Sequence, residues 1–211
     1  MKNFILKNKL FYRLYQNIIR NKKNEYDFIK FIFEKNKSEI NILDVCCGDS
    51  YILKYISKYV KNYTGLDNNK GYLKQSRKDY PNFKFYYLDI KKIKSLNTNK
   101  INFIFLNGAI HHFNDETIKN LLNYINKKFP KAIFLSIDPL RENNNFINKL
   151  MINNDRGEFI RNKKQYKKIM GKFSRLITED FFIMKFLLIF HFKNIDLKKM
   201  FNQWQKKLNY L

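Results

Sequence analysis

The sequence predicts a single α/β domain built on a doubly wound, mostly parallel sheet. Between residues 40 and 138, short runs rich in apolar and β-branched residues alternate with stretches of helical periodicity. This alternation is typical of βαβ units, whose helices cover both faces of a parallel sheet. The chain has 211 residues, of which 45% are hydrophobic, so it is long and apolar enough to bury one substantial core.

The individual elements follow from the spacing of the apolar residues. Those from Phe4 to Ile19 recur at helical spacing, which predicts an amphipathic first helix. The same periodicity predicts further helices over Tyr26–Glu34, Tyr51–Val60, Lys70–Lys78 and Glu116–Lys128. Strands are expected where short apolar runs stand between the helices, over Ile40–Val45, Tyr63–Leu66, Phe83–Leu88, Ile101–Leu106 and Ala132–Ile137.

After Pro139 this alternation loosens. Helices are expected over Asn145–Met151 and Lys163–Met170, and two strands over Ser174–Asp180 and Lys185–Phe192. No helix separates these two strands, so we expect an antiparallel hairpin at the sheet edge, followed by a basic terminal helix with one apolar stripe. Right-handed crossovers then restrict the topology to a Rossmann-like sheet.

The formal net charge of +24 favours anionic partners. Lys supplies most of this charge, and the basic residues are spread from Lys2 to Lys207 rather than gathered in one patch. Asn and Ile are abundant while Gly and Ala are scarce, a joint bias that a genome-wide codon preference explains without selection for an anionic partner. The charge therefore leaves nucleic acid, an anionic membrane surface and an anionic small molecule open as partners.

Cysteine usage and hydropathy predict a soluble cytoplasmic protein. The only cysteines, Cys46 and Cys47, are adjacent, which excludes a disulfide framework. The most apolar run, Phe181–Phe192, is interrupted by Lys185 and is shorter than the ~20 residues of a membrane span. The beginning of the chain has no uninterrupted apolar segment, so it does not resemble a secretory signal.

Four loops that follow predicted strands contain residues suited to ligand binding. In a doubly wound sheet, ligands bind beyond the carboxyl ends of the strands. The first loop has small residues that let a ligand approach the backbone, and the next two place carboxylates that accept hydrogen bonds from hydroxyl or amino groups. Taken singly, each could be an ordinary solvated turn, but all four follow successive strands of one sheet. The loops are Leu43–Ser50, Gly65–Asp67, Leu88–Ile90 and Leu106–Phe113.

The first of these loops resembles the first motif of class I S-adenosylmethionine-dependent methyltransferases, a hydrophobic strand followed by acid-x-Gly-x-Gly-x-Gly. Asp44 stands at the acidic position, and Cys46, Gly48 and Ser50 stand at the three glycine positions. The resemblance implies S-adenosyl-L-methionine as the cofactor. It places Asp67 on the ribose, Asp89 with Ile90 on the adenine and Asn107 with Gly108 at the methionine end. The implied cofactor-binding residues are Asp44, Cys46, Gly48, Asp67, Asp89, Ile90, Asn107 and Gly108.

Two segments outside the cofactor loops resemble a bacterial methyltransferase subfamily associated with surface-polysaccharide synthesis. They are Leu14–Ile19 and Asp155–Arg161, the second of which is followed by Tyr166. The resemblance covers nearly the whole chain and implies a small-molecule acceptor, such as a hydroxyl of a sugar or sugar nucleotide. The sequence departs from the subfamily at Phe181–Ile189, where the subfamily has a more polar stretch.

The same resemblance divides the single domain, residues 1–211, into three parts. Residues 1–38 are expected to form an N-terminal helical lid over the substrate side. Residues 39–138 form the cofactor-binding half, and residues 139–211 form the substrate-side half with the terminal helix.

Candidate catalytic and acceptor-binding residues lie near these loops. Direct methyl transfer requires alignment, and a hydroxyl acceptor benefits from a general base, for which either His111 or His112 is suited. Either His could equally be a packing or capping residue, and two adjacent His lack the ligand spacing of a zinc site. Arg forks match phosphate geometry, so basic residues would bind an anionic acceptor. We therefore expect an acceptor site that contains Tyr15, Arg141, Arg156 and Arg161.

Other functions fit parts of the sequence. An RNA substrate is compatible with the charge, although the fourth loop reads Asn107-Gly108-Ala109-Ile110 instead of the Asn/Asp-Pro-Pro-aromatic loop of nucleic-acid amino-methyltransferases. A catalytically inactive binding module of the same fold would fit Ser50 and the altered edge at Phe181–Ile189. A dinucleotide dehydrogenase is disfavoured because the first loop lacks Gly-x-Gly-x-x-Gly.

Overall fold

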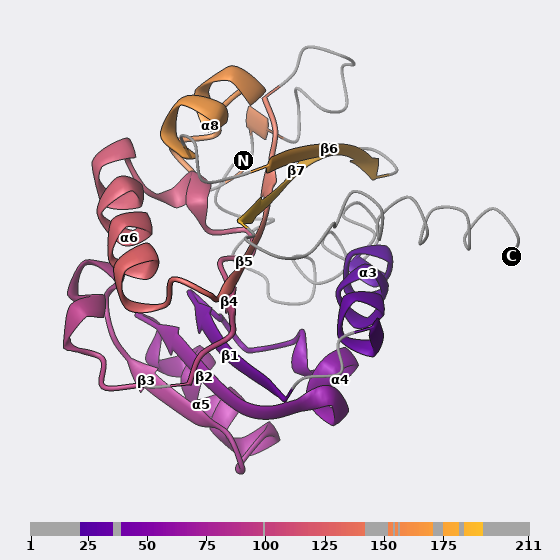
Figure 1. Cartoon of the computed structure of the whole chain (residues 1–211), viewed down its shortest axis with the longest axis vertical. Helices are drawn as coiled ribbons and strands as arrows, with labels where there is room; N and C mark the ends of the chain where they lie inside the picture. The colour runs from indigo at the N-terminus through magenta and orange to yellow at the C-terminus, as the bar shows by residue number, and fades with distance from the viewer. Residues whose placement is uncertain are drawn as a thin grey trace, which may run out of the picture.

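The computed structural model describes residues 22–35, 39–98, 100–141, 152–153, 155, 157–170, 175–181 and 184–191 (Figure 1). The predicted first helix, the predicted Asn145–Met151 helix and the predicted terminal helix lie outside the described residues. So do two of the expected acceptor-site residues, Tyr15 and Arg156.

The centre of the molecule is one sheet, whose strands are β1 (Ile40–Val45), β2 (Val60–Asp67), β3 (Lys84–Tyr87), β4 (Phe103–Phe105), β5 (Ile133–Pro139), β6 (Arg175–Phe181) and β7 (Met184–His191). Their order across the sheet is β3-β2-β1-β4-β5-β7-β6. Strands β1 to β5 are parallel, and β7 pairs antiparallel with both of its neighbours. The strand order reverses between β1 and β4, as in a doubly wound sheet. The predicted parallel, Rossmann-like sheet is therefore confirmed.

Helices cover both faces of this sheet, and they are α3 (Lys22–Lys35), α4 (Leu53–Ile56), α5 (Lys70–Asp79), α6 (Asp115–Lys128) and α8 (Lys163–Met170). Three short 3₁₀ helices accompany them, η1 (Ser57–Tyr59), η2 (Ile90–Ser95) and η3 (Ile110–His112). Helices α3 and α4 lie on one side of the sheet and α6 lies on the other (Figure 1). Asn114 accepts a hydrogen bond from the Thr117 N–H at 2.9 Å, a typical N-cap that sets the start of α6.

The predicted helix over Tyr51–Val60 is wrong in its extent. Only Leu53–Ile56 is α-helical, η1 follows directly, and Val60 already belongs to β2. Val60 pairs with Ile40 of β1, and its β-branched side chain suits a strand better than a helix. By contrast, α5, α6 and α8 begin and end within one residue of the predicted bounds.

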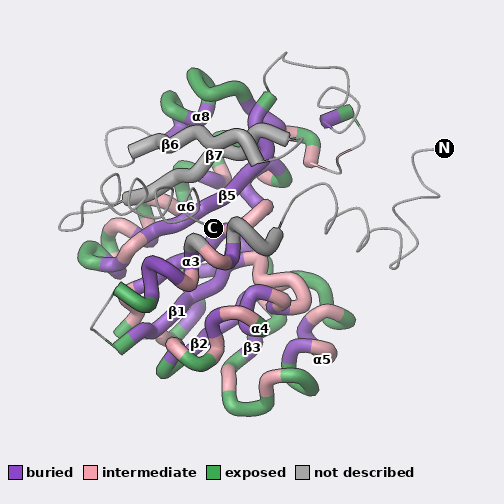
Figure 2. Tube along the Cα trace, turned by 90° about the vertical axis from the view of Figure 1, so that its right-hand side faces the viewer, coloured by how far each residue is buried: buried purple, intermediate pink, exposed green. Residues whose placement is uncertain are grey.

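Apolar side chains of the strands alternate between the two faces of the sheet and build two buried clusters. Ile42 of β1 packs on the side of α3 and α4, whereas the next residue, Leu43, packs on the side of α6. Both side chains are fully buried. Figure 2 shows β1 and β5 as buried strands between their covering layers. Burial on both faces explains why β1 reads as an almost continuous apolar run.

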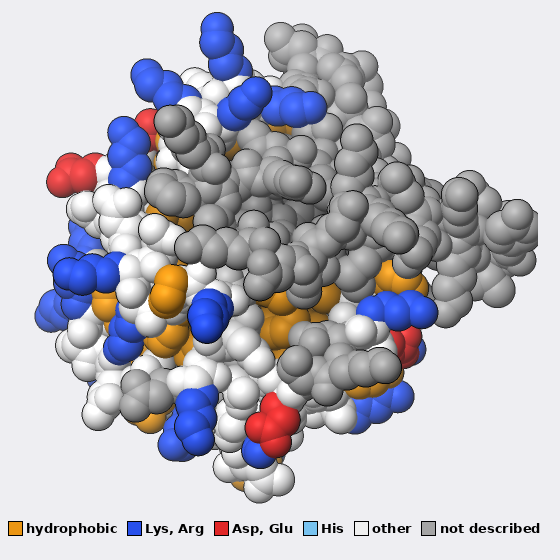
Figure 3. All heavy atoms as spheres, in the orientation of Figure 1, with side chains coloured by type: hydrophobic (Ala, Val, Ile, Leu, Met, Phe, Trp, Pro, Cys, Tyr) orange, Lys and Arg blue, Asp and Glu red, His pale blue; other side chains and the backbone are white. Residues whose placement is uncertain are grey.

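The described surface is basic, but its Lys and Arg residues are not concentrated in one place. In Figure 3, Lys and Arg side chains stand at several separate positions on the visible face, with uncharged surface between them. This agrees with their spread along the sequence. Among the helices of the described residues, none has the length and apolar character needed to cross a membrane.

Candidate functional site

The loop after β1 is joined to the end of β2 by hydrogen bonds. The Gly48 N–H donates to Asp67 Oδ2 at 2.9 Å, and the Cys47 N–H donates to the Leu66 carbonyl at 2.9 Å. Gly48 has a φ of 57°, which belongs to the left-handed region that glycine adopts without strain. Cys46 and Ser50 also have positive φ values, 62° and 53°, so the loop coils tightly at every second residue. The loop and the acid after the neighbouring strand therefore form one unit.

The first acid of the motif, Asp44, points into the protein. Its Oδ2 accepts a hydrogen bond from the Tyr63 hydroxyl at 2.5 Å, and its side chain is buried. Burial raises the pKa of Asp44 to about 7; the hydrogen bond from Tyr63 opposes this rise and the negative charge of Asp67 adds to it. Asp44 thus braces the carboxyl end of β1 against β2.

The residues at the first and last glycine positions are accommodated inside the loop. Ser50 is fully buried, and its Oγ lies 3.2 Å from the Ser76 Oγ of α5, so its hydroxyl packs against that helix. Burial raises the pKa of both the Cys46 and the Cys47 thiol well above the usual range. Neutral thiols of this kind pack as small apolar groups. A Cβ on Gly65 would lie 2.8 Å from the Cys47 sulfur, which shows how closely this loop approaches β2.

Asp67 holds two backbone N–H groups and keeps acceptor capacity for a ligand. Its Oδ2 accepts from Gly48, and its Oδ1 accepts from the Asn69 N–H at 2.8 Å. An ionised carboxylate offers about four acceptor positions, so roughly two are left for further donors. The carboxylate is partly exposed at the end of β2, where a pair of ribose hydroxyls could reach it.

The loops after β3 and β4 place exposed polar and small residues where a ligand site is expected. Asp89 is exposed and begins η2 by accepting a hydrogen bond from the Lys91 N–H at 2.8 Å, while Ile90 beside it is buried. Gly108 follows β4 with a φ of 65°, and its N–H donates to the Ile137 carbonyl of β5 at 2.7 Å. The structure thus brings the predicted cofactor residues to one edge, at the carboxyl ends of β1, β2, β3 and β4.

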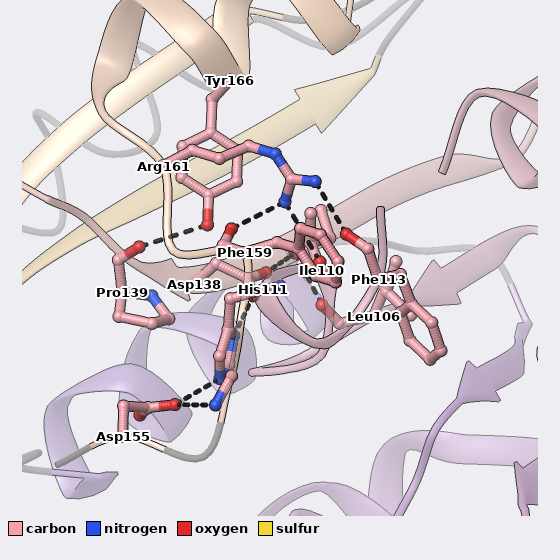
Figure 4. Close-up of polar contacts among 12 residues, drawn as sticks. Leu106, Ile110, His111, Phe113, Asp138, Pro139, Asp155, Phe159, Arg161 and Tyr166 are labelled. Carbon is pink, nitrogen blue, oxygen red and sulfur yellow. Dashed lines mark hydrogen bonds and ion pairs between the residues drawn. The ribbon is translucent and has the colours of Figure 1, made fainter. Parts of the chain in front are cut away.

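His111 stands between two carboxylates (Figure 4). Its Nδ1 lies 2.7 Å from Asp138 Oδ1, and its Nε2 lies 3.2 Å from Asp155 Oδ1. Its backbone N–H also donates to Asp138 Oδ1, at 3.2 Å. Burial alone would lower the pKa of this imidazole, but the hydrogen bonds and charges of the two carboxylates outweigh burial and raise the pKa to about 9. The pKa of Asp155 is lowered by the same pairing, against the effect of its own burial.

Sequence reasoning did not single out the two acids that hold His111. Asp138 lies at the end of β5 and is completely buried, and Asp155 begins the segment that resembles the polysaccharide subfamily. The position of Asp138 at a strand end is the same signal that identified Asp67 and Asp89. Within the described residues, no group of three or more His, Cys, Asp or Glu side chains is arranged to hold a metal ion.

Arg161, an expected acceptor-binding residue, is buried, and its side chain hydrogen-bonds to other groups of the protein. Its five N–H groups make five hydrogen bonds, two of them to Asp115 Oδ1 at 2.8 and 3.0 Å. The other three go to backbone carbonyls, and the residue is only 5% exposed. The anion-binding role expected for Arg161 is therefore corrected: no N–H group is left for an acceptor. The three carbonyls are those of Ile110, Phe113 and Phe159.

Of the remaining acceptor candidates, Arg141 is described and exposed. Its backbone N–H donates to the Arg161 carbonyl at 2.9 Å, and its Nε donates to the Ile160 carbonyl at 3.1 Å. Its anion-binding role stays a prediction.

The stability of the protein should fall as the pH rises through about 9. The pKa of His111 is raised above the value of about 6.5 for an unfolded His, so its contribution is complete below pH ~6.5 and is lost as the pH rises through the folded value. The shift corresponds to about 3 kcal/mol. Urea unfolding at pH 6.5 and pH 10 should show this loss in the wild type and a smaller loss in His111→Gln. Equal pH dependence of the two proteins would contradict the raised pKa.

Comparison with known proteins gives a domain match over part of the chain and a fold. Residues 42–128 match the family model described as a methyltransferase domain. A search of curated proteins finds no match. Among solved structures, the plantazolicin methyltransferase BpumL in complex with a pentazolic desmethylPZN analog and SAH is 13% identical with a TM-score of 0.65, covering 91% of this chain and 95% of its own.

Two further structures have the same fold. The PH0226 protein from Pyrococcus horikoshii OT3 is 13% identical with a TM-score of 0.62, covering 88% of this chain and 100% of its own. The mitomycin 7-O-methyltransferase MmcR is 11% identical with a TM-score of 0.60 over 79% of this chain, which spans only 53% of that protein. The methyltransferase-domain match covers residues 42–128, and the reversed strand order with acids at the ends of β1, β2 and β3 agrees with the class I methyltransferase fold that the resemblance implied.

Proposed function

We propose that this protein is an S-adenosylmethionine-dependent methyltransferase and that it transfers the methyl group to a hydroxyl of a small molecule, with a sugar or sugar nucleotide as the acceptor class. The observation that carries the cofactor half of the proposal is the hydrogen bond from the Gly48 N–H to Asp67. It joins the small-residue loop to the acid that would hold the ribose, so both are already in place for one ligand.

The residues present fit the cofactor. Asp67 has acceptor positions left for the two ribose hydroxyls, and Asp89 is exposed where it could accept from the adenine amino group, with Ile90 against the ring. Asn107 and Gly108 would line the methionine end. The loop residues Asp44, Cys46 and Gly48 would shape the backbone on which the cofactor rests.

When bound, S-adenosylmethionine supplies a methyl group activated by a sulfonium. The protein's own part is alignment of the acceptor with that methyl group and removal of the hydroxyl proton by a base on η3. An anionic acceptor would be bound by Arg141, together with Tyr15 and Arg156. The resemblance of Asp155–Arg161 to the polysaccharide subfamily supports a sugar acceptor. We also propose that β6 and β7 form the antiparallel hairpin expected beside β5, at the end of the strand order.

The cofactor assignment is tested by calorimetry with the purified protein. S-adenosylmethionine and S-adenosylhomocysteine should both bind, because the two acids after β2 and β3 accept from ribose and adenine in either. NAD should bind much more weakly, since the loop after β1 lacks the glycine spacing for a pyrophosphate. Tight NAD binding without any S-adenosylhomocysteine signal would overturn the proposal.

The acceptor is tested by transfer of a radioactive methyl group to a panel of sugars, sugar nucleotides and RNA. We expect product with a sugar or sugar nucleotide. The charge of +24 supports RNA as the second candidate, and methylated RNA without any labelled sugar would establish that alternative. Cofactor binding without transfer to any acceptor would favour an inactive binding module.

A further inference from the structure

The short helix after β4 is held from outside by the segment that begins at Asp155. The Phe159 N–H donates to the His111 carbonyl at 2.9 Å. Arg161 donates to the Ile110 carbonyl at 3.4 Å and to the Phe113 carbonyl at 2.7 Å. The His111 carbonyl belongs to η3 and the Phe113 carbonyl directly follows it, while the Ile110 carbonyl also accepts the Phe113 N–H at 3.1 Å within the turn. The backbone of η3 therefore depends on residues about fifty positions further along the chain.

The side chain of His111 is the second point at which this segment holds η3. Asp155 contacts Nε2 while Asp138, at the end of β5, contacts Nδ1. Gly157 lies so close to the imidazole that a Cβ there would be 2.0 Å from His111 Cδ2. Figure 4 shows the imidazole enclosed between the two acids, with Arg161 and Tyr166 above it. A ring held on both nitrogens and packed on its edge has one orientation.

This arrangement assigns different tasks to the two adjacent His residues. Both nitrogens of His111 face carboxylates, so both carry protons and neither can accept another. His112 is exposed, and its ring centroid lies 4.2 Å from that of His111. The fixed ring of His111 is therefore a surface against which the ring of His112 rests.

We propose that Asp155 is a positioning residue: with Asp138 it fixes His111 as a doubly hydrogen-bonded imidazolium, and His111 in turn sets the place of His112, the general base. The inference rests on the proposed function and selects the base for it. Among the described residues, the titratable groups around the His111 ring are Asp138 from β5, Asp155 from the covering segment and His112 from η3 itself, with Arg161 and Asp115 on the far side of the η3 backbone.

We call the pair of hydrogen bonds from His111 to Asp138 and Asp155 the clamp. Nuclear magnetic resonance of ¹⁵N-labelled histidine tests the clamp without any acceptor. In the wild type, His111 should carry protons on both nitrogens at pH 7.5 and titrate well above a free His. Asp155→Asn should reduce the proton affinity of His111 at least about tenfold, one pKa unit, and shift the ring signals of His112. The signals are assigned with His111→Gln and His112→Gln.

Glu158→Gln is the matched control. It removes the same charge from the same segment, but Glu158 is exposed and lies outside the bonds that hold η3. Its imidazole titrations should match those of the wild type. An ordinary titration of His111 in the wild type, or an Asp155→Asn spectrum equal to that of Glu158→Gln, would overturn the clamp.

Methyl transfer to the acceptor found in the panel tests the consequence for catalysis. His112→Gln should lower kcat by roughly 100-fold or more with the KM for S-adenosylmethionine unchanged, as expected for loss of a general base. Asp155→Asn should lower kcat and alter its pH profile, and Glu158→Gln should do neither. Full activity of His112→Gln would contradict the assignment. Absence of cofactor binding by the wild type would count against the proposed function, whereas the imidazole spectra bear on the clamp alone.

Discussion

Asp67→Ala should weaken the binding of S-adenosylhomocysteine at least tenfold and should also lower the melting temperature of the protein without ligand. The first effect follows from the loss of charge-assisted hydrogen bonds to the ribose hydroxyls, each worth about 1.5–3 kcal/mol. The second follows because Asp67 accepts the N–H groups of Gly48 and Asn69, which would lose their partner. Calorimetry and thermal unfolding measure the two effects separately.

The control for this substitution is Asp79→Ala. Asp79 is an exposed acid of α5 whose contact is a hydrogen bond from Gln75, so the same charge is removed away from the loops. Affinity and melting temperature should both stay close to those of the wild type. If Asp67→Ala lowers the melting temperature but leaves S-adenosylhomocysteine affinity unchanged, Asp67 holds the loop after β1 and does not hold the ribose.

Gly157→Ala should destabilise the protein by about 3 kcal/mol, more than an ordinary Gly-to-Ala change. The new Cβ would stand 2.0 Å from His111 Cδ2 and 2.7 Å from the His111 carbonyl oxygen. Overpacking of a filled site costs about 1–3 kcal/mol, and here the ring cannot turn away without leaving Asp138 and Asp155. For a chain of this length the loss corresponds to a fall of roughly 6–12 °C in Tm.

Gly71→Ala provides the comparison. Gly71 lies in the first turn of α5, where a Cβ would meet only the Asn69 side chain, at 3.2 Å. Alanine is the better helix former, so the change in Tm should be small and of either sign. Thermal unfolding of the two variants under the same conditions is the measurement. Equal Tm values for both would show that His111 is not held where the structure places it.

The sheet and its ligand edge could be predicted because both depend on local pattern. β1 reads as an apolar run since it is buried on both faces, and the acids at the ends of β1, β2 and β3 follow directly from the strand positions. The start of β2 could not be predicted, because Val60 continues the helical spacing of α4 and joins the sheet only through its pairing with Ile40.

The contacts of η3 could not be predicted for a different reason. Nothing in the local sequence separates Arg161 from an exposed anion-binding Arg, since its five hydrogen bonds go to residues 2 to 51 positions away. The same holds for His111, whose acids come from β5 and from the segment beyond it. The sequence singled out Asp155–Arg161 only by its resemblance to one subfamily. In the structure, residues of this segment hold η3 by hydrogen bonds.

The distance along the chain between η3 and its support also orders the assembly of the protein. The bonds from Arg161 to Asp115 and Ile110 close loops of 46 and 51 residues. Contacts of this separation form against a larger loss of chain entropy than the pairing of β1 with β2 or of β4 with β5, whereas the pairing of β1 with β4 closes a loop of similar length. On the ribosome, β1 to β5 are synthesised before Asp155 and Arg161. A nascent chain could therefore pair β1 with β2 at a stage when the contacts that hold η3 cannot yet form.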